Sequence, residues 1–583
     1  MKSKWKPKMP RNRAFLVGCL ALTTSICVPL AMAQIAPPEA VETTQLATDA
    51  FAIGALDAGE RGLPENLWSN SDPQTLDFLL THAPSRPPSP SLGSAFRRTL
   101  LSPGAKPAGA DTSLGGRKLL ALARAGFVEE ARTIASLATA GRNDISVAEA
   151  EATISLLTDD ADGACRRGAS LAGGREAIFW VRLRAFCYAR AGELAAFDLT
   201  MNLLRERGLM TAAEESLFLA VATGAPPKTV PAVETAVQYA AIKAAGIEIN
   251  PASLGEAHGG VVAAVVADAE ASPPLRIEAA QHAIAMGVAE PALLARLFTG
   301  VTFDVAELAA AVDRAIAQPA DPLSDALLYQ SIAAMNAPEF IRDKAQRISF
   351  ALDRADSFRR AYALSHLYAS EIGALEGVLV TPQEAASFAL AAMATGDSVG
   401  AGRWLSAMIG ANETVTALPE ELGVIFIDRV NLLSMLDPQT AVQIARSAGV
   451  SLIADEATFA PRLPAHADPQ VTARILEAAF DAVAGSKTGQ AGLAALAASS
   501  GNSALSGEVE AVIVNEGLAA AGMPELRRRH EFERAWASSF DMSAVASSPS
   551  DASAPTDETP QASAAAAQEQ GGLTPRLKPS RSQ

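Results

Sequence analysis

Apolar residues recur along most of the chain with the spacing of an α-helix. Phe179, Leu183 and Phe186 fall on one face of a 3.6-residue period. Leu328 and Ile332 repeat the pattern farther along the chain. Segments of roughly 10–16 residues follow one another in this way, separated by short turns that contain Gly or Pro. The pattern predicts many helices that pack as antiparallel pairs.

Paired capping and proline residues predict where individual helices begin. A side-chain oxygen before a proline accepts from the free N–H groups of the first turn, and proline at the first helical position lacks an N–H that would be unpaired. Glu384 adds the acidic residue of a capping box to one of these starts. The pairs are Asp72-Pro73, Asn250-Pro251, Asp321-Pro322, Thr381-Pro382, Asp437-Pro438 and Asp468-Pro469.

Composition favours the same fold class. Aromatic residues make up only 5% of the chain, which disfavours an all-β sandwich or barrel. The 35 Pro and 41 Gly interrupt the chain too often for a coiled-coil rod. Short β-branched runs at 261–266 and 424–427 lie in helical surroundings, so we expect helix there as well. The prediction is an all-α protein, an irregular α-solenoid of antiparallel helical hairpins with a disordered C-terminal tail.

Proline clusters and composition shifts divide the chain into five predicted parts. Residues 83–90 hold four prolines and predict an extended linker, with short helices around 41–58 and 74–80. Residues 224–231 hold three prolines and mark an internal boundary. The parts are 1–33 (signal peptide), 34–110 (Pro-rich with short helices), 111–224 (helical-repeat block), 232–540 (second helical array) and 541–583 (a Ser/Ala/Pro-rich tail expected to be disordered).

Two segments resemble the middle of a tetratricopeptide repeat, and a third does so in part. Residues 122–131 and 188–196 place a Gly at a turn and a small Ala where two helices would touch, and residues 394–401 share the turn. Gly126 and Gly192 are 66 positions apart, close to two 34-residue periods of that family. The resemblance to the tetratricopeptide family implies stacked helical hairpins with a concave protein-binding face. In composition the whole chain also resembles the large Ala-rich exported helical proteins of Gram-negative bacteria, a likeness that implies no activity. The alternative is an irregular Ala-rich helical array.

The N-terminus has the three parts of a secretory signal peptide. The first thirteen residues hold Lys2, Lys4, Lys6, Lys8, Arg11 and Arg13 and no acid. A largely apolar run follows at 14–30, and Ala31-Met32-Ala33 stands before Gln34 as an A-x-A site. We therefore expect export to the periplasm with cleavage between Ala33 and Gln34.

Two alternatives remain at this end of the chain. The first is a retained membrane anchor, because the apolar run is close to the shortest length that spans a bilayer. Residues 16–19 also fit a lipobox by letter, ending at Cys19. N-terminal sequencing of the mature protein should give Gln34 as the first residue; a start at Met1, or a lipid on Cys19, would contradict cleavage after Ala33.

Removal of residues 1–33 makes the chain more acidic. The whole chain has 48 basic and 64 acidic residues, and loss of the six basic residues of the signal leaves 42 against 64, a net charge of −22. An acidic surface repels phosphate backbones, so nucleic acid is not an expected partner. It attracts basic segments, and we expect a partner protein of the envelope that carries one. No membrane span is expected in the mature chain.

The same cleavage leaves two cysteines, Cys165 and Cys187. In an oxidising compartment two cysteines predict one disulfide, the alternative being two separately buried thiols. A symmetric hairpin turning at Gly173 would leave Cys165 about 9 Å from the level of Cys187. The predicted bond therefore requires an asymmetric loop or steeply crossed helices.

Catalytic and metal-binding motifs are absent from the sequence. The six histidines include no i, i+4 pair, so a zinc HExxH motif is excluded, and no Gly-x-Ser-x-Gly elbow, Walker loop or dinucleotide fingerprint occurs. Residues 159–163 resemble half of a calcium loop, but Ala169 stands where its last carboxylate is needed, so a helix-capping loop is expected. His258 and His366 are expected to be surface or core residues. No catalytic, cofactor-binding or metal-binding residue is predicted.

These observations favour an exported periplasmic helical-repeat scaffold that mediates protein–protein interactions in the cell envelope and is not an enzyme. One alternative is a peptidoglycan-acting enzyme, a lytic transglycosylase or hydrolase, whose paired carboxylates would depend on the fold and carry no sequence motif. Another is a passive envelope spacer. Copurifying partners favour the scaffold, and peptidoglycan turnover favours the enzyme.

Overall fold

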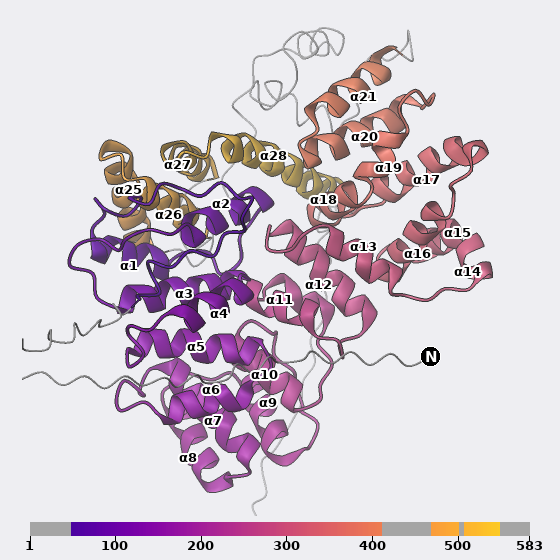
Figure 1. Ribbon diagram of the computed structural model, residues 1–583. Helices are drawn as coiled ribbons and strands as arrows, with labels where there is room; N and C mark the ends of the chain where they lie inside the picture. The colour runs from indigo at the N-terminus through magenta and orange to yellow at the C-terminus, as the bar shows by residue number, and fades with distance from the viewer. Residues whose placement is uncertain (1–47, 411–467, 501–506, 548–583) are drawn as a thin grey trace, which may run out of the picture. The chain divides into compact units, whose positions relative to one another are not determined.

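The computed structural model describes residues 48–410, 468–500 and 507–547. These residues form α-helices joined by turns, together with two short 3₁₀ helices, and no strand occurs among them (Figure 1). The all-α prediction is confirmed. The predicted signal peptide, its cleavage site at Ala33 and Gln34, and the predicted tail beyond residue 547 lie outside the described residues.

The helices have the following bounds. Those before residue 270 are α1 (Pro73–Thr81), α2 (Pro90–Leu101), α3 (Ser113–Ala125), α4 (Val128–Leu137), α5 (Ile145–Leu157), α6 (Ala161–Ala169), α7 (Ile178–Ala191), α8 (Leu194–Glu206), α9 (Ala212–Thr223), α10 (Ala236–Ala244), η1 (Pro251–Gly255) and α11 (Gly259–Ala267). Those that follow are α12 (Pro273–Ala285), α13 (Ala292–Thr299), α14 (Val305–Ala309), α15 (Ala311–Ala317), α16 (Pro322–Ala333), η2 (Pro338–Phe340), α17 (Ile341–Asp353), α18 (Phe358–Leu367), α19 (Ala369–Ala374), α20 (Pro382–Thr395), α21 (Ser398–Gly410), α25 (Pro469–Ala484), α26 (Thr488–Ala498), α27 (Gly507–Ala520) and α28 (Pro524–Ser547).

The predicted helix starts are confirmed wherever the structure describes them. Asp72 caps α1 by accepting from the Thr75 N–H, and Thr381 and Glu384 form a reciprocal capping box at the start of α20. The remaining pairs start η1, α16 and α25 in the same way, and the pair at 437–438 lies outside the described residues. These starts were predictable because a cap is a contact between residues only two or three positions apart.

The three glycines of the repeat-like segments each end a helix. Gly126, Gly192 and Gly396 have left-handed backbones with φ of 112°, 71° and 78°, a conformation open to glycine at little cost. The next helix begins two residues later in each case, as α4, α8 and α21. The turns join consecutive helices that pack on each other. Membership of the tetratricopeptide family stays a prediction.

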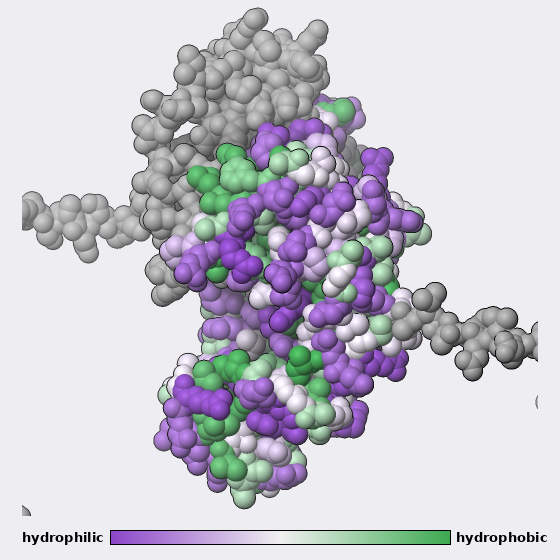
Figure 2. All heavy atoms as spheres, turned by 90° about the vertical axis from the view of Figure 1, so that its left-hand side faces the viewer, coloured by the Kyte–Doolittle hydropathy of each residue, from purple (hydrophilic) through white to green (hydrophobic). Residues whose placement is uncertain are grey.

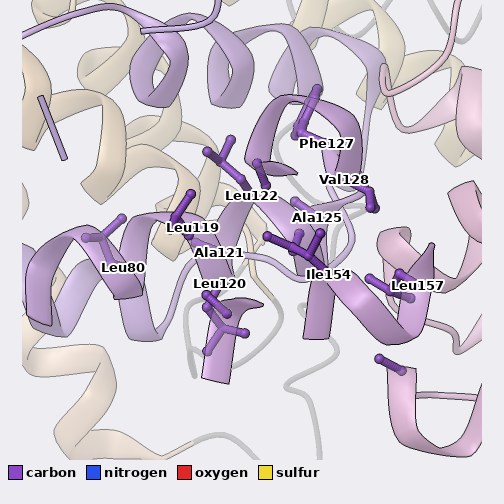
Figure 3. Close-up of a cluster of buried hydrophobic side chains, with 14 of the residues drawn as sticks. Leu80, Leu119, Leu120, Ala121, Leu122, Ala125, Phe127, Val128, Ile154 and Leu157 are labelled. Atoms are coloured by element: carbon purple, nitrogen blue, oxygen red, sulfur yellow. The ribbon is translucent and has the colours of Figure 1, made fainter. Parts of the chain in front are cut away.

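Two clusters of buried apolar side chains form the interior. The first core draws on residues 50–286 and 475–526, and the second core on residues 277–408 and 532–536. The helix α12 separates them: Leu275 and Ala279 face the first core, whereas Ile277 and Ala280 face the second. Figure 3 shows part of the first core, where Leu119 and Leu122 of α3 lie near Ile154 of α5.

The cores divide the chain differently from the predicted parts. The first core continues across residues 224–231, so that proline-rich turn does not separate two cores. The N-terminal part contributes Phe51, Trp68 and Leu76 to the first core, each at most 1% exposed. The short helix predicted around 41–58 is absent from its described part, residues 48–58. The predicted linker at 83–90 is hydrogen-bonded to α11, because the Gly259 N–H donates to the Ser85 carbonyl at 2.8 Å. At the other end, α28 continues seven residues past the predicted boundary at 540.

The last described helices pack on the first ones. α26 and α28 contact α2, and α26 also contacts α1 (Figure 1). The Ser91 N–H at the start of α2 donates to the carboxylate of Glu533 at 3.0 Å, across 442 positions of sequence. Farther along α28, Trp536 meets Phe358 of α18 edge to face with ring centroids 5.6 Å apart. α28 therefore ties the N-terminal helices to the second core, a contact that a simple one-dimensional stack of hairpins does not make.

The exposed face in Figure 2 is mostly hydrophilic, with separate hydrophobic patches. Some large apolar side chains are well exposed, among them Leu199 at 73% and Phe480 at 71%. Within the described ranges, no helix combines the length and the apolar character needed to cross a membrane.

Candidate functional site

A cleft of about 150 Å³ lies where five helices of the first core come together. α7, α10 and α11 contribute their N-terminal ends, α3 its C-terminal end and α5 its second half. The polar side chains that line the cleft are Arg124, Thr153, Arg182, Thr235 and His258. Its apolar wall includes Leu157, Ile178, Phe179, Val237 and Val261. No aspartate or glutamate is among the described residues that line it.

Two glycines bring α11 against α3 and so form one wall of the cleft. A Cβ atom on Gly259 would lie 2.1 Å from the Ala125 carbonyl oxygen, and one on Gly260 would lie 2.2 Å from the Ala123 carbonyl oxygen. Any larger residue would push the start of α11 away from the end of α3. The close approach places His258, which precedes α11, beside Arg124 at the end of α3.

Arg124 and His258 lie side by side in the cleft, and of the two only Arg124 is charged at neutral pH. The Arg124 guanidinium bonds the Glu149 carboxylate at 3.2 Å, and burial lowers its pKa from the usual very high value. Burial, reinforced by the charge of Arg124, lowers the pKa of His258 to about 4. His258 is therefore neutral at physiological pH, while the arginine stays protonated.

Arg182 is held by α9 and the turn before it. Its Nη2 donates to the Leu209 carbonyl at 2.8 Å and lies 3.4 Å from the Glu214 carboxylate. Glu214 is itself buried, and it accepts from the Gln238 side chain of α10 at 3.1 Å. This network fixes one side of the guanidinium and links three helices. The Nε of Arg182 is buried and has no hydrogen-bond partner within the described parts of the chain.

Cys165 of α6 and Cys187 of α7 stand at disulfide geometry, with Cα atoms 5.7 Å apart. Cys165 is four residues before the end of α6, whereas Cys187 is nine residues after the start of α7. The two helices are therefore offset, which removes the difficulty that a symmetric hairpin would pose. The bond connects α6 to the helix that carries Phe179 and Arg182.

Thiol titration tests this bond chemically. The mature protein, denatured without reductant, should show no free thiol, and two after reduction. A C165S/C187S double variant supplies the zero-thiol baseline under both conditions. Two free thiols before reduction would show that the cysteines are separately buried instead.

The acidic run at 159–163 and His366, which the sequence analysis considered as possible ligands, have structural roles instead. Asp160 caps α6 by accepting from the Gly163 N–H at 2.8 Å, so the acidic run at 159–163 is the helix-capping loop that we expected. His366 lies in α18 with its ring 4.7 Å from that of Tyr362. Across the described residues, no group of three or more His, Cys, Asp or Glu side chains is placed to hold a metal ion.

The cleft combines fixed hydrogen-bond donors with an apolar wall. Two arginine side chains and a histidine that is neutral at pH 7 suit the binding of an acceptor group. Sequence reasoning did not find Arg124 and Arg182, because they are 58 positions apart and no local motif joins them. The only local signal was the Gly259-Gly260 pair after His258, which marks a close backbone approach.

Comparisons with known proteins identify no relative: no family model, no curated protein and no solved structure matches the chain.

Proposed function

We propose that this protein is an exported, non-catalytic binding scaffold of the periplasm that holds another envelope protein. The observation that carries the proposal is the cleft, whose polar groups are fixed by Glu149, the Leu209 carbonyl and Glu214. Groups held in this way present a rigid binding surface, which reduces the ordering that binding requires.

The ionisable groups of the cleft support binding more than catalysis. An arginine does not exchange protons near neutral pH, and a general base needs a pKa near the working pH. The pKa of His258 at about 4 is well below that range. A periplasmic location rests on the N-terminal signal and on the two cysteines, and a basic partner segment rests on the net charge of −22 after cleavage.

Crosslinking in intact cells, followed by purification of the mature protein, tests the proposal against its rivals. We expect recovery of a specific envelope protein, and weaker recovery at high salt, because exposed charges are screened over about 8–10 Å at physiological ionic strength. The purified protein is expected to leave peptidoglycan intact. Degradation of peptidoglycan would favour the enzyme, and a strong envelope defect with no crosslinked partner would favour the passive spacer.

A further inference from the structure

We propose that the cleft binds a carboxylate attached to an apolar side chain, as found at the carboxyl end of a peptide. The inference rests on the proposed binding function and names the group that the cleft recognises. The protein is acidic overall, yet two arginines and no carboxylate line this cleft among the described residues. Each arginine is already paired with a carboxylate outside the lining, Arg124 with Glu149 and Arg182 with Glu214, so the cleft offers an anion oriented donors and not a net positive charge.

Arg182 supplies a donor that lacks an acceptor. Its Nη2 is occupied by the Leu209 carbonyl and Glu214, whereas its buried Nε has no partner in the described ranges. Buried polar groups in proteins are nearly always hydrogen-bonded, and an exception points to a missing ligand or water. A carboxylate forms a strong charge-assisted hydrogen bond with a guanidinium N–H, so it is an acceptor that fits the free Nε–H.

Three helices start at the cleft. Ile178, Ala236 and Gly259 are the first residues of α7, α10 and α11. The start of α7 has no side-chain cap. At α11 the Gly259 N–H already donates to the Ser85 carbonyl, so the uncapped first turn that the cleft offers is that of α7. Partial positive charge at a helix N-terminus favours an anion. These ends and the two arginines lie around the same cavity.

The apolar wall and the size of the cleft determine which side chain can accompany the carboxylate. Leu157, Phe179, Val237 and Val261 surround a volume of about 150 Å³. This is room for one apolar side chain and its carboxylate, so the rest of a peptide would lie outside. A peptide whose last residue is apolar and whose preceding residues are basic satisfies both the cleft and the acidic surface around it.

Binding of short labelled peptides to the mature full-length protein tests the proposal. The peptide Lys-Lys-Ala-Leu is compared with the same peptide ending in a carboxamide, by fluorescence anisotropy at low salt. We expect the carboxylate form to bind at least about 10-fold more tightly, since a lost charged hydrogen bond leaves arginine donors unpaired. Equal affinity of the two forms, or no binding of either at millimolar concentration, would overturn the proposal. This comparison needs no variant and holds even if a variant fails to fold.

Variants then locate the site. Arg182→Gln and Arg124→Gln should each weaken the carboxylate form by about 10-fold and leave the carboxamide form unchanged. Arg132→Gln is the matched control, because Arg132 is 60% exposed, pairs with Glu129 on its own helix and does not line the cleft. An equal loss with Arg132→Gln would place the binding elsewhere and overturn the assignment to the cleft.

A third measurement distinguishes a peptide end from a small molecule as the source of the carboxylate. If N-acetyl-leucine binds as tightly as the peptide, the carboxylate site is supported and its ligand is a small molecule; weaker binding supports a peptide end. The outcome is distinguishable from failure of the proposed function. A partner crosslinked in cells whose capture does not depend on Arg124 or Arg182 would retain the scaffold and reject the carboxylate site.

Discussion

Replacement of Asp325 by alanine is expected to lower the free energy of unfolding by about 3–5 kcal/mol. Asp325 lies in α16 with its side chain 1% exposed and accepts from Arg360 of α18 through two contacts of 2.8 Å. Arg354, the residue after α17, pairs with the same carboxylate. Both guanidinium groups are buried, so removal of the carboxylate leaves two positive charges without the buried acceptor that they share.

Asp356→Ala is the matched control for this prediction. Asp356 lies 3.7 Å from the same Arg360, but its side chain is 62% exposed. An exposed ion pair contributes less than about 1 kcal/mol, so this variant should unfold almost as the unmodified protein does. A difference of less than about 1 kcal/mol between the two variants would contradict the assigned role of the buried carboxylate.

Tryptophan fluorescence during urea unfolding can localise the effect. Trp68 and Trp180 belong to the first core, and Trp404 and Trp536 to the second, where Asp325 makes its contacts. In a protein of residues 34–583, which lacks Trp5, with Trp68→Phe and Trp180→Phe, the remaining signal reports the second core. The Asp325→Ala shift should appear in that signal.

The second large effect is loss of stability as the pH falls from 6.5 to 4.5. Three half-buried or buried histidines have pKa values lowered chiefly by burial and further by a nearby arginine: about 4 for His258, about 2 for His282 and about 4 for His366. In this window the unfolded chain protonates them and the folded chain does not. Protons therefore bind preferentially to the unfolded state, and stability falls as pH decreases.

Two glutamates oppose this trend, because burial raises the pKa of both Glu510 and Glu533. Burial raises the pKa of Glu510 to about 7, so the folded chain binds its proton first and gains stability as the pH falls through the same window. Each group changes stability by up to about 1.4 kcal/mol per pH unit, so three histidines against Glu510 give a net loss of ~5 kcal/mol over two units, which Glu533 makes smaller. Urea unfolding at a series of pH values measures it.

The variant His282→Gln shows whether the histidines cause the loss. His282 lies in α12 between two arginines: Arg86 contacts its Nδ1, and Arg359 lies 2.9 Å from its Nε2. Glutamine does not titrate, so the slope of stability against pH should decrease by about 1.4 kcal/mol per pH unit. An unchanged slope in this variant, or a flat profile in the unmodified protein, would contradict the explanation.

The sequence predicted the parts of this fold that depend on neighbours in the chain. The cap at Asp72, the capping box of Thr381 with Glu384 and the turn at Gly126 each involve residues within a few positions, and all three occur as expected. The helical class follows from such local patterns together with the periodicity of apolar residues.

Contacts between distant segments could not be predicted in the same way. Ser91 and Glu533 meet across 442 positions, and no property of either residue identifies the other. The division of the cores at α12 depends on the helix burying both of its sides, which an Ala-rich sequence shows only weakly. The cleft likewise brings together Arg124, Arg182 and His258 from three segments of the chain. Each residue can be read from the sequence, but their proximity in the fold cannot be predicted from it.

Site-specific photocrosslinking from the cleft in intact cells is the most direct test of the binding-scaffold account. A photoreactive amino acid replaces Ile178, which lines the cleft and is 39% exposed, or Ile316 of α15, which is 64% exposed and not a cleft residue. The account predicts an adduct with a specific envelope protein from position 178, none of that adduct from position 316, and its loss with Arg182→Gln. Absence of an adduct from position 178, or the same adducts from both positions, would contradict it.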